Sequence, residues 1–298
     1  MLFQLPHLGE ILALACAIIW ATAVILFRKS GETVPPLGLN LFKNVLALVL
    51  FVPTSLVLGV TLWPHAPANE YLLLSASGVI GIAISDTLFF KSLNLLGAEL
   101  SAIVDCLYSP FIIGLSVLFI HESISGFQLF GVLLIVSAVL AISGIGDKKN
   151  IARHDLILGV VLGILAMASM AVGIVMIKPL LNRSPLLWVV EVRLLAGCVG
   201  LGLYLLIHPR GKKIISSVLS MRNWQYMLPG SFLGAYLAMV VWMGGMKYTQ
   251  ASIASALNQT SNVFVFILAA VFLREPVNFV RVLAIILAFS GAFIVSFG

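Results

Sequence analysis

The sequence predicts an all-α membrane protein of ten transmembrane helices, arranged as two inverted five-helix repeats. Composition is the first reason: 61% of the 298 residues are hydrophobic and 9% are charged, whereas soluble proteins carry about 25% charged residues. Lipid must therefore solvate much of the surface. The net charge of +6 does not indicate nucleic-acid binding, because the basic residues stand singly between apolar stretches and anchor helix ends.

Ten apolar stretches are the second reason. A helix needs about 20 mostly apolar residues to cross a bilayer. We expect spans at 8–27, 38–60, 71–90, 98–119, 126–145, 156–177, 186–207, 226–246, 251–273 and 277–297. The links between spans three and four, and between eight and nine, are very short, so each pair should form a tight antiparallel hairpin.

An internal repeat is the third reason. Shifts of 153 and 150 positions superimpose distinctive residues of the two halves: Gly81 on Gly234, Asp105 on Asn258, Glu122 on Glu275, Arg28 on Lys178 and Lys43 on Arg193. We place one repeat at 1–146, a connecting loop at 147–155 and the other repeat at 156–298. Five spans per half is an odd number, so the second half must insert inverted, as in many secondary transporters.

Ionisable residues inside the spans are the best candidates for a site, because a charge in hydrocarbon costs on the order of 3 kcal/mol. Asp86 and Asp105 lead, since each lies several residues inside a predicted span. A carboxylate in such a place can bind a proton or a substrate cation and release it as the cavity rehydrates. Alternatively, either aspartate pairs with Lys43 and locks the spans together.

Lys43 and Arg193 occupy equivalent positions near the start of the second span of each half. In an inverted repeat they would flank one cavity and could recognise an anionic group on a substrate. The alternative for Lys43 is that its side chain extends to the membrane interface. Glu191 lies two residues from Arg193, so the two face apart on a helix and should have different partners.

Other polar and aromatic residues within the spans complete the candidate set: Asn40, Tyr108, Asn258, Asn262, Trp20, Tyr236 and Trp242. Asn258 and Asn262 share a helix face, whereas an interhelical hydrogen bond is the simpler expectation for Gln259. The aromatic residues could line a cavity or simply pack. We interpret Glu122 and Glu275, each before the last span of its half, as caps of a helix N-terminus.

Enzyme and metal chemistry find no support in the sequence. Cys16, Cys106 and Cys198 lie in apolar stretches without ligand spacing, so we expect buried thiols, no metal and no cofactor. The histidines lie at span ends, and neither His-Glu-x-x-His nor Gly-x-Ser-x-Gly occurs. We therefore do not expect an enzyme.

Two motifs carry a family resemblance. Each half has an apolar-apolar-x-Glu sequence before its last span, Phe119-Ile-His-Glu122 and Phe272-Leu-Arg-Glu275. The segment from Gly81 through Asp86 to Gly97-Ala98 forms the link between spans three and four. The chain thereby resembles the drug/metabolite transporter superfamily, specifically its EamA-like members. The resemblance implies export of amino acids, other metabolites or drugs, or exchange of sugar conjugates.

We therefore expect a multi-pass protein of the cell inner membrane or plasma membrane that exports a small polar or amphipathic metabolite, amino-acid-like or drug-like, by alternating access. Its partners would be a small-molecule substrate, the lipid bilayer and protons, with no nucleic acid, and it would act as a monomer or homodimer. The alternatives are a flippase for a lipid-linked precursor and a membrane receptor that does not transport.

The orientation in the membrane has two opposed indications. Lys and Arg gather in the connections after spans one, three, five, seven and nine, which favours extracytoplasmic termini. The family resemblance implies cytoplasmic termini.

Overall fold

The computed structural model describes residues 7–61, 64–120, 125–144, 151–220, 224–249 and 251–297. Within these ranges the chain forms helices and no strand. Seven helical segments are long and apolar enough to cross a membrane, and shorter apolar helices cover Gly126–Ala138, Leu257–Leu273 and Phe279–Ile294. These three fall on the predicted spans 126–145, 251–273 and 277–297.

The first half of the chain consists of α1 (Leu8–Ser30), α2 (Pro36–Val57), α3 (Ala68–Gly78), η2 (Val79–Ile84), α4 (Ser85–Leu96), α5 (Ala98–Asp105), α6 (Tyr108–Ile120) and α7 (Gly126–Gly144). Pro36 begins α2, where its missing N–H costs nothing. Only Gly97, with φ at 81°, separates α4 from α5. This backbone angle suits glycine and makes the tight hairpin that the sequence predicts.

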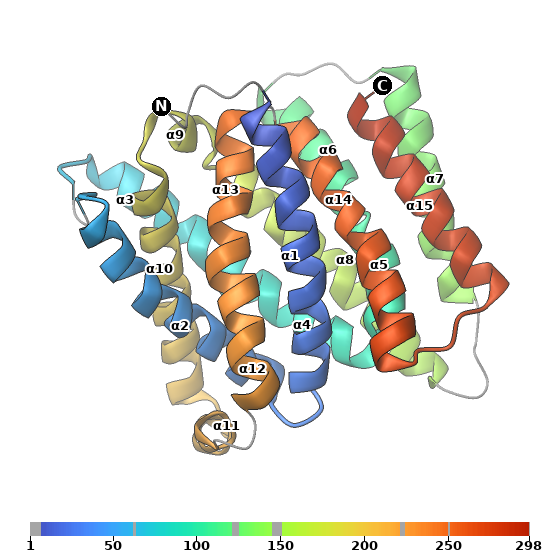
Figure 1. Cartoon of the computed structure of the whole chain (residues 1–298), viewed down its shortest axis with the longest axis horizontal. Coiled ribbons are helices and arrows are strands. Elements are labelled where there is room, and N and C mark those ends of the chain that lie inside the picture. Colours follow the sequence, from blue (N-terminus) through green and yellow to red (C-terminus); the bar gives the residue numbers. More distant parts are fainter. Residues whose placement is uncertain are drawn as a thin grey trace.

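The second half consists of α8 (Arg153–Val175), α9 (Lys178–Arg183), α10 (Leu186–Ile207), α11 (Gly211–Leu219), α12 (Trp224–Ser231), η4 (Phe232–Leu237), α13 (Ala238–Tyr248), α14 (Ala251–Leu268), η5 (Ala269–Leu273) and α15 (Phe279–Phe297). The short helices α9 and α11 lie in connections that sequence analysis left without structure. Both stand at the ends of the bundle (Figure 1).

The two halves contact each other reciprocally. Helix α1 packs on α12, η4 and α13 of the other half, and its counterpart α8 packs on η2 and α4. The pairs α2 and α10, α5 and α14, and α7 and α15 each join an element to its own counterpart. The start of α1 and the end of α15 lie at one end of the bundle, which we call the terminal end, and α11 lies at the other, which we call the α11 end (Figure 1).

Glycines bring these helices into close contact. A Cβ atom added to Gly159 would lie 2.7 Å from the Leu96 side chain, and one added to Gly234 would lie 2.7 Å from the Phe27 ring. Because the two glycines have no side chain, α8 can approach α4 and η4 can approach α1. Small residues commonly allow such close contact between helices in membranes.

Two π-helical turns occupy equivalent positions of the repeat. Val79–Ile84 and Phe232–Leu237 are related by the same shift of 153 positions that superimposes Gly81 on Gly234. A π-turn inserts an extra residue into the α-helical pattern and frees backbone groups from their usual partners. Both turns face the centre of the molecule, where the candidate site lies.

Candidate functional site

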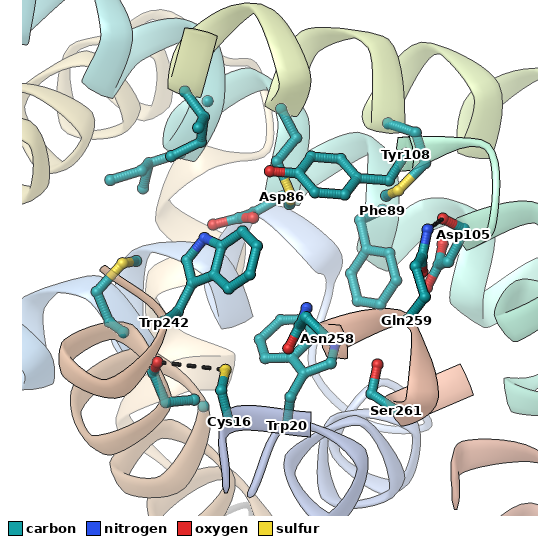
Figure 2. A pocket seen from close by; sticks show the side chains of 18 of the residues that line it. Cys16, Trp20, Asp86, Phe89, Asp105, Tyr108, Trp242, Asn258, Gln259 and Ser261 are labelled. Carbon is teal, nitrogen blue, oxygen red and sulfur yellow. Dashed lines mark hydrogen bonds between the residues drawn. The ribbon is translucent and has the colours of Figure 1, made fainter. Parts of the chain in front are cut away.

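A cavity lies between the two halves. Its walls come from α1, α2, η2, α4, α5, α6, α8, α10, η4, α13 and α14. The structure brings most of the predicted site residues to this cavity, namely Trp20, Lys43, Asp86, Asp105, Tyr108, Arg193, Trp242, Asn258 and Asn262 (Figure 2). Their part in binding stays a prediction. Asn40, Glu191 and Tyr236 do not line the cavity.

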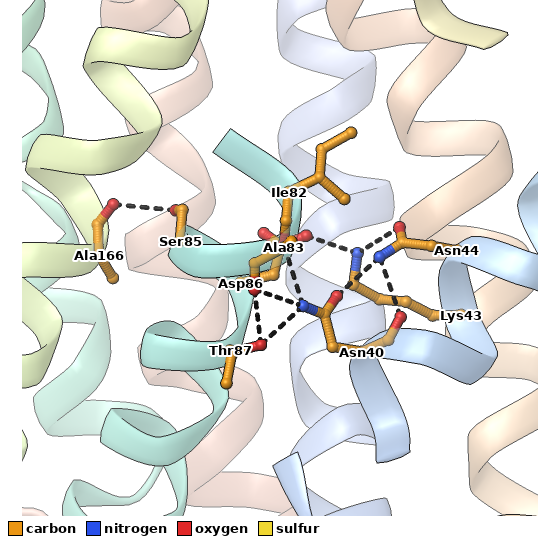
Figure 3. A network of polar contacts seen from close by, with 9 residues as sticks. All are labelled: Asn40, Lys43, Asn44, Ile82, Ala83, Ser85, Asp86, Thr87 and Ala166. Carbon is orange, nitrogen blue, oxygen red and sulfur yellow. Dashed lines mark hydrogen bonds and ion pairs between the residues drawn. The ribbon is translucent and has the colours of Figure 1, made fainter. Parts of the chain in front are cut away.

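Lys43 and Asp86 form a buried ion pair at one wall. The Lys43 Nζ atom lies 2.7 Å from Asp86 Oδ2 and also donates to Asn44 Oδ1 at 2.9 Å (Figure 3). Lys43 is 3% exposed. Its side chain therefore does not extend to the membrane interface. The prediction of an interfacial Lys43 is wrong because a carboxylate inside the bundle offers the ammonium group a closer partner.

Asn40 stabilises this wall by hydrogen bonds and does not itself line the cavity. Its amide donates to the carbonyl oxygens of Ile82 and Ala83 at 3.0 and 3.2 Å and to Thr87 Oγ1 at 2.9 Å (Figure 3). Those carbonyls belong to the π-turn η2, where the regular helical hydrogen bonds are interrupted. Asn40 thus fixes the turn that precedes Asp86 without facing the cavity.

Asp105 lies at a break in the fourth predicted span. Helix α5 ends at Asp105 and α6 begins at Tyr108. The Gln259 amide, on α14, donates to the carbonyls of Asp105 and Cys106 at 3.3 and 3.2 Å and to Ser109 Oγ at 3.2 Å. Broken helices are tolerated in membranes where a neighbouring helix satisfies the freed carbonyls. The interhelical hydrogen bond expected for Gln259 is confirmed.

Several polar groups in the cavity lack a partner. Within the described part of the chain, the Asp105 carboxylate makes no ion pair or side-chain hydrogen bond. Asn258 Oδ1 and the Tyr108 hydroxyl are buried and have no hydrogen-bond partner. Buried polar groups are normally satisfied, so unpaired ones indicate a place for water, an ion or a ligand.

Arg193 brings a cation to the same cavity from α10. It is 4% exposed, its Nη1 donates to the Met243 sulfur at 3.4 Å, and its Nε has no partner. Among the described residues no carboxylate forms an ion pair with it. Glu191 instead accepts a hydrogen bond from Ser55 on α2, which confirms that these neighbours have different partners.

Aromatic and sulfur-containing side chains form the rest of the wall. Trp20 packs against Phe89 with ring centroids 5.9 Å apart, and Tyr108 lies 6.1 Å from Trp242 (Figure 2). Sequence analysis did not single out several lining residues, which are mostly apolar: Cys16, Phe89, Met167, Met170 and Met239. In an apolar helix, residues of these types occur both toward lipid and toward a cavity. Residue type therefore does not identify cavity-lining positions, and the internal repeat was the only available signal.

Tyr236 does not belong to this wall. Its hydroxyl lies 2.7 Å from Thr54 Oγ1, and its ring packs edge-on against Phe51 at 4.9 Å. The prediction that it lines the cavity is wrong, because its hydroxyl finds a partner on α2.

Glu275 joins the halves at the α11 end. Its carboxylate accepts hydrogen bonds from the backbone N–H groups of Ala98 and Glu99, each at 2.9 Å, and lies 3.9 Å from Arg28. It therefore caps α5 of the other half, and not the last helix of its own half as predicted. Glu99 in turn pairs with Arg281 at 3.0 Å. Glu122, the predicted counterpart, lies outside the described residues.

The terminal end is held differently. Lys178, the counterpart of Arg28, donates to the backbone carbonyls of Met246 and Thr249 at the end of α13. Burial lowers the pKa of Lys178. The structure thus has the buried Glu99–Arg281 pair and the Glu275 cap between the halves at the α11 end, whereas the more exposed Arg183–Glu70 pair, at 2.7 Å, joins the halves at the terminal end.

The described residues contain no group of three or more His, Cys, Asp or Glu side chains that could hold a metal ion. Cys16 and Cys106 are buried and Cys198 is half-buried, all as free thiols. The predicted buried thiols are therefore confirmed for Cys16 and Cys106.

The two halves of the chain are also recognised separately in a comparison with known protein families. The model of the EamA-like transporter family matches residues 7–144 and again 157–297. The chain belongs to the EamA-like transporter family. This EamA-like protein is therefore a multi-pass membrane protein with transporters as its relatives.

The chain is similar to proteins described as uncharacterized transporters. The chain is 27% identical to an uncharacterized transporter of Archaeoglobus fulgidus over 271 residues, covering 90% of this chain and 91% of the relative. It is 27% identical over 191 residues to the uncharacterized transporter YetK of Bacillus subtilis, covering 62% of this chain and 56% of YetK. A solved crystal structure has the same fold, with a TM-score of 0.68, 18% identity and coverage of 96% and 94%.

Proposed function

We propose that this EamA-like protein is a secondary active transporter that exports a small amphipathic metabolite through the central cavity by alternating access. The observation that carries the proposal is the pair of opposite, unpaired charges, Asp105 and Arg193, in one buried cavity lined by aromatic rings. Buried charges without partners are costly and mark substrate or ion sites in membrane proteins.

The chemistry of the cavity narrows the substrate class. Asp105 and Asn258 offer oxygen acceptors for a cationic or donor group, and Arg193 and Tyr108 offer donors for an anionic or acceptor group. Rings and thioethers can cover an apolar body between them. We therefore propose a dipolar or zwitterionic molecule with an apolar part, which amino-acid-like and drug-like compounds both satisfy.

The mechanism we propose uses ten membrane spans in two inverted repeats that rock about the cavity. The reciprocal contacts between the halves support it, because each half offers its counterpart the same surfaces. Proton coupling would use Asp105 first, since its carboxylate has no partner, and Asp86 second, since Lys43 already holds it.

The test is flux in reconstituted vesicles. Purified protein is first screened with metabolites for thermal stabilisation, and the stabilising compounds are then assayed for uptake under an imposed pH gradient. We expect a response to the gradient in the native protein and a changed response in Asp105→Asn. Glu191→Gln is the matched control, because it removes a carboxylate that lies outside the cavity. Stabilisation without flux would favour a receptor, and an unchanged response in Asp105→Asn and Asp86→Asn would remove the proton role.

A further inference from the structure

Helix α11 crosses the end of the bundle instead of running along it. Figure 1 views α11 nearly end-on, whereas α10 and α12, which flank it in the chain, run lengthwise. It follows the exposed end of α10 directly, where Leu206 and Ile207 are 79% and 80% exposed. Such side chains at the end of a membrane span lie close to the boundary between acyl chains and headgroups.

One face of α11 is fixed to the protein. Ile214 is buried, and Ile214 and Val218 cover Gly38 on α2 so closely that an added Cβ atom there would lie 2.7 Å from Val218 Cγ2. The Trp224 indole N–H donates to the Val218 carbonyl at 2.9 Å. The helix therefore has a set rotation, and its other faces point away from the bundle.

A second face is apolar and uncovered. Ile215 is 38% exposed and Leu219 is 67% exposed. These residues are four apart, so they share one side of the helix. Leu206 and Ile207, at the end of α10, are exposed and apolar as well. In a protein that spans a membrane, acyl chains are the available cover for such side chains.

The first turn of α11 is cationic. Lys212 and Lys213 are exposed, and Arg210 is exposed immediately before the helix. Within the described residues neither lysine has an ion-pair or hydrogen-bond partner. The carboxylates of Glu32 and Glu275 at this end are engaged with basic side chains of their own. The positive charge of α11 is therefore uncompensated by the described residues.

We propose that α11 is an interfacial helix that binds anionic phospholipid headgroups. Arg210, Lys212 and Lys213 supply the charge, and Ile215 and Leu219 enter the acyl-chain boundary. Phosphodiester headgroups fit this arrangement because a cluster of basic residues attracts an anionic surface, while the adjacent apolar face requires the attached chains. A free anion would contact only the basic side chains and would leave Ile215 and Leu219 uncovered. The proposal does not depend on which molecule the cavity accepts.

The experiment measures how lipid shifts the thermal unfolding midpoint of the full chain in detergent micelles. Phosphatidylglycerol, phosphatidylcholine and inorganic phosphate are added separately. We expect phosphatidylglycerol to raise the midpoint more than the other two, and this excess to fall to roughly half or less in the variant K212Q/K213Q. The variant K212R/K213R should restore it, because the charge is retained.

The matched control is K91Q/R153Q, which removes two exposed basic residues elsewhere on the molecule. It should keep the response to phosphatidylglycerol. An equal loss in K91Q/R153Q would show a general effect of net charge and overturn the site. An equal response to inorganic phosphate would overturn the headgroup assignment, as would an unchanged response in K212Q/K213Q. Native mass spectrometry of retained phosphatidylglycerol gives a second readout that does not depend on stability.

Discussion

At the residue scale, the cavity contains two kinds of charge. Lys43 and Asp86 neutralise each other at 2.7 Å, whereas Asp105 and Arg193 have no ion-pair partner among the described residues. The first arrangement holds helices α2 and α4 together, and the second leaves charge for a ligand. The two pairs therefore require different experiments.

The paired charges should matter for stability. Lys43→Met leaves Asp86 buried without its cation, and breaking one side of a buried pair costs about 3 kcal/mol or more. We expect a lower thermal unfolding midpoint in the single variant. Adding Asp86→Leu should recover much of the loss, because no buried charge then remains. If the double variant were less stable than either single one, the pair would have no special weight.

Gln259 should stabilise the break between α5 and α6. Gln259→Leu leaves the carbonyls of Asp105 and Cys106 without their donor, which costs about 2 kcal/mol. Thermal unfolding measures the effect. Thr22→Val is a suitable control, because its hydroxyl bonds only the carbonyl of Ile18 within the same helix. A change no larger than in the control would mean that water satisfies the break.

At the element scale, the position of α10 depends on glycines that face it. Gly78 lies so close to the Arg193 carbonyl that an added Cβ atom would overlap it. The missing side chain lets α10 approach the start of η2 and places Arg193 beside Gly81. The turn η2 and the cation of the cavity are therefore positioned by the same contact.

Gly78→Ala should push these elements apart. Overpacking of this kind costs about 2 kcal/mol, because the clash is with backbone and not with a movable side chain. We expect a lower unfolding midpoint and weaker binding of any ligand that depends on Arg193. The control Gly202→Ala lies in α10 itself, where an added Cβ atom meets nothing within 4 Å. Helix propensity favours alanine over glycine, so equal effects in both variants would show that the clash at Gly78 has no special weight.

Sequence and structure agree best on the long elements. Hydropathy located the long spans because a run of about 20 apolar residues is typical of a membrane-spanning helix and rare in other structures. The repeat then placed Asp105 opposite Asn258 and brought both to one cavity. Helix α11 escaped notice because its nine residues include two lysines and two serines and do not form an apolar run long enough to span a membrane. The π-turns could not be predicted, because one extra residue leaves the hydropathy pattern unchanged. The position of Tyr236 could not be predicted either, because the partner of its hydroxyl group lies on another helix.

At the scale of the whole molecule, the halves are tied unequally at their two ends. Glu275 reaches from one half to cap α5 of the other, beside Arg28. At the terminal end, Arg183 pairs with Glu70 of the other half, but the Arg183 side chain is largely exposed, so solvent screens this pair. The α11 end should therefore be the harder one to open.

Glu275→Gln should ease that opening. Losing the charge of the cap costs about 1 kcal/mol, which shifts a two-state equilibrium about fivefold. Cys16 lines the cavity and can report the change. In a background of Cys106→Ser and Cys198→Ser, we expect faster labelling of Cys16 by a membrane-impermeant maleimide. Glu32→Gln is the control, since it removes a carboxylate whose partner Lys29 lies in its own segment. Equal labelling rates in the two variants would remove Glu275 from the closure.

The two π-turns also carry a record of the history of the chain. Each adds one residue to a helix, and the additions fall at the same register in both halves, at Val79–Ile84 and Phe232–Leu237. The third π-turn, η5 (Ala269–Leu273), has no such counterpart, because the equivalent positions 116–120 belong to α6. The shared position indicates that the ancestral half-length gene already encoded the irregular turn before it was duplicated, and that both copies have kept it since.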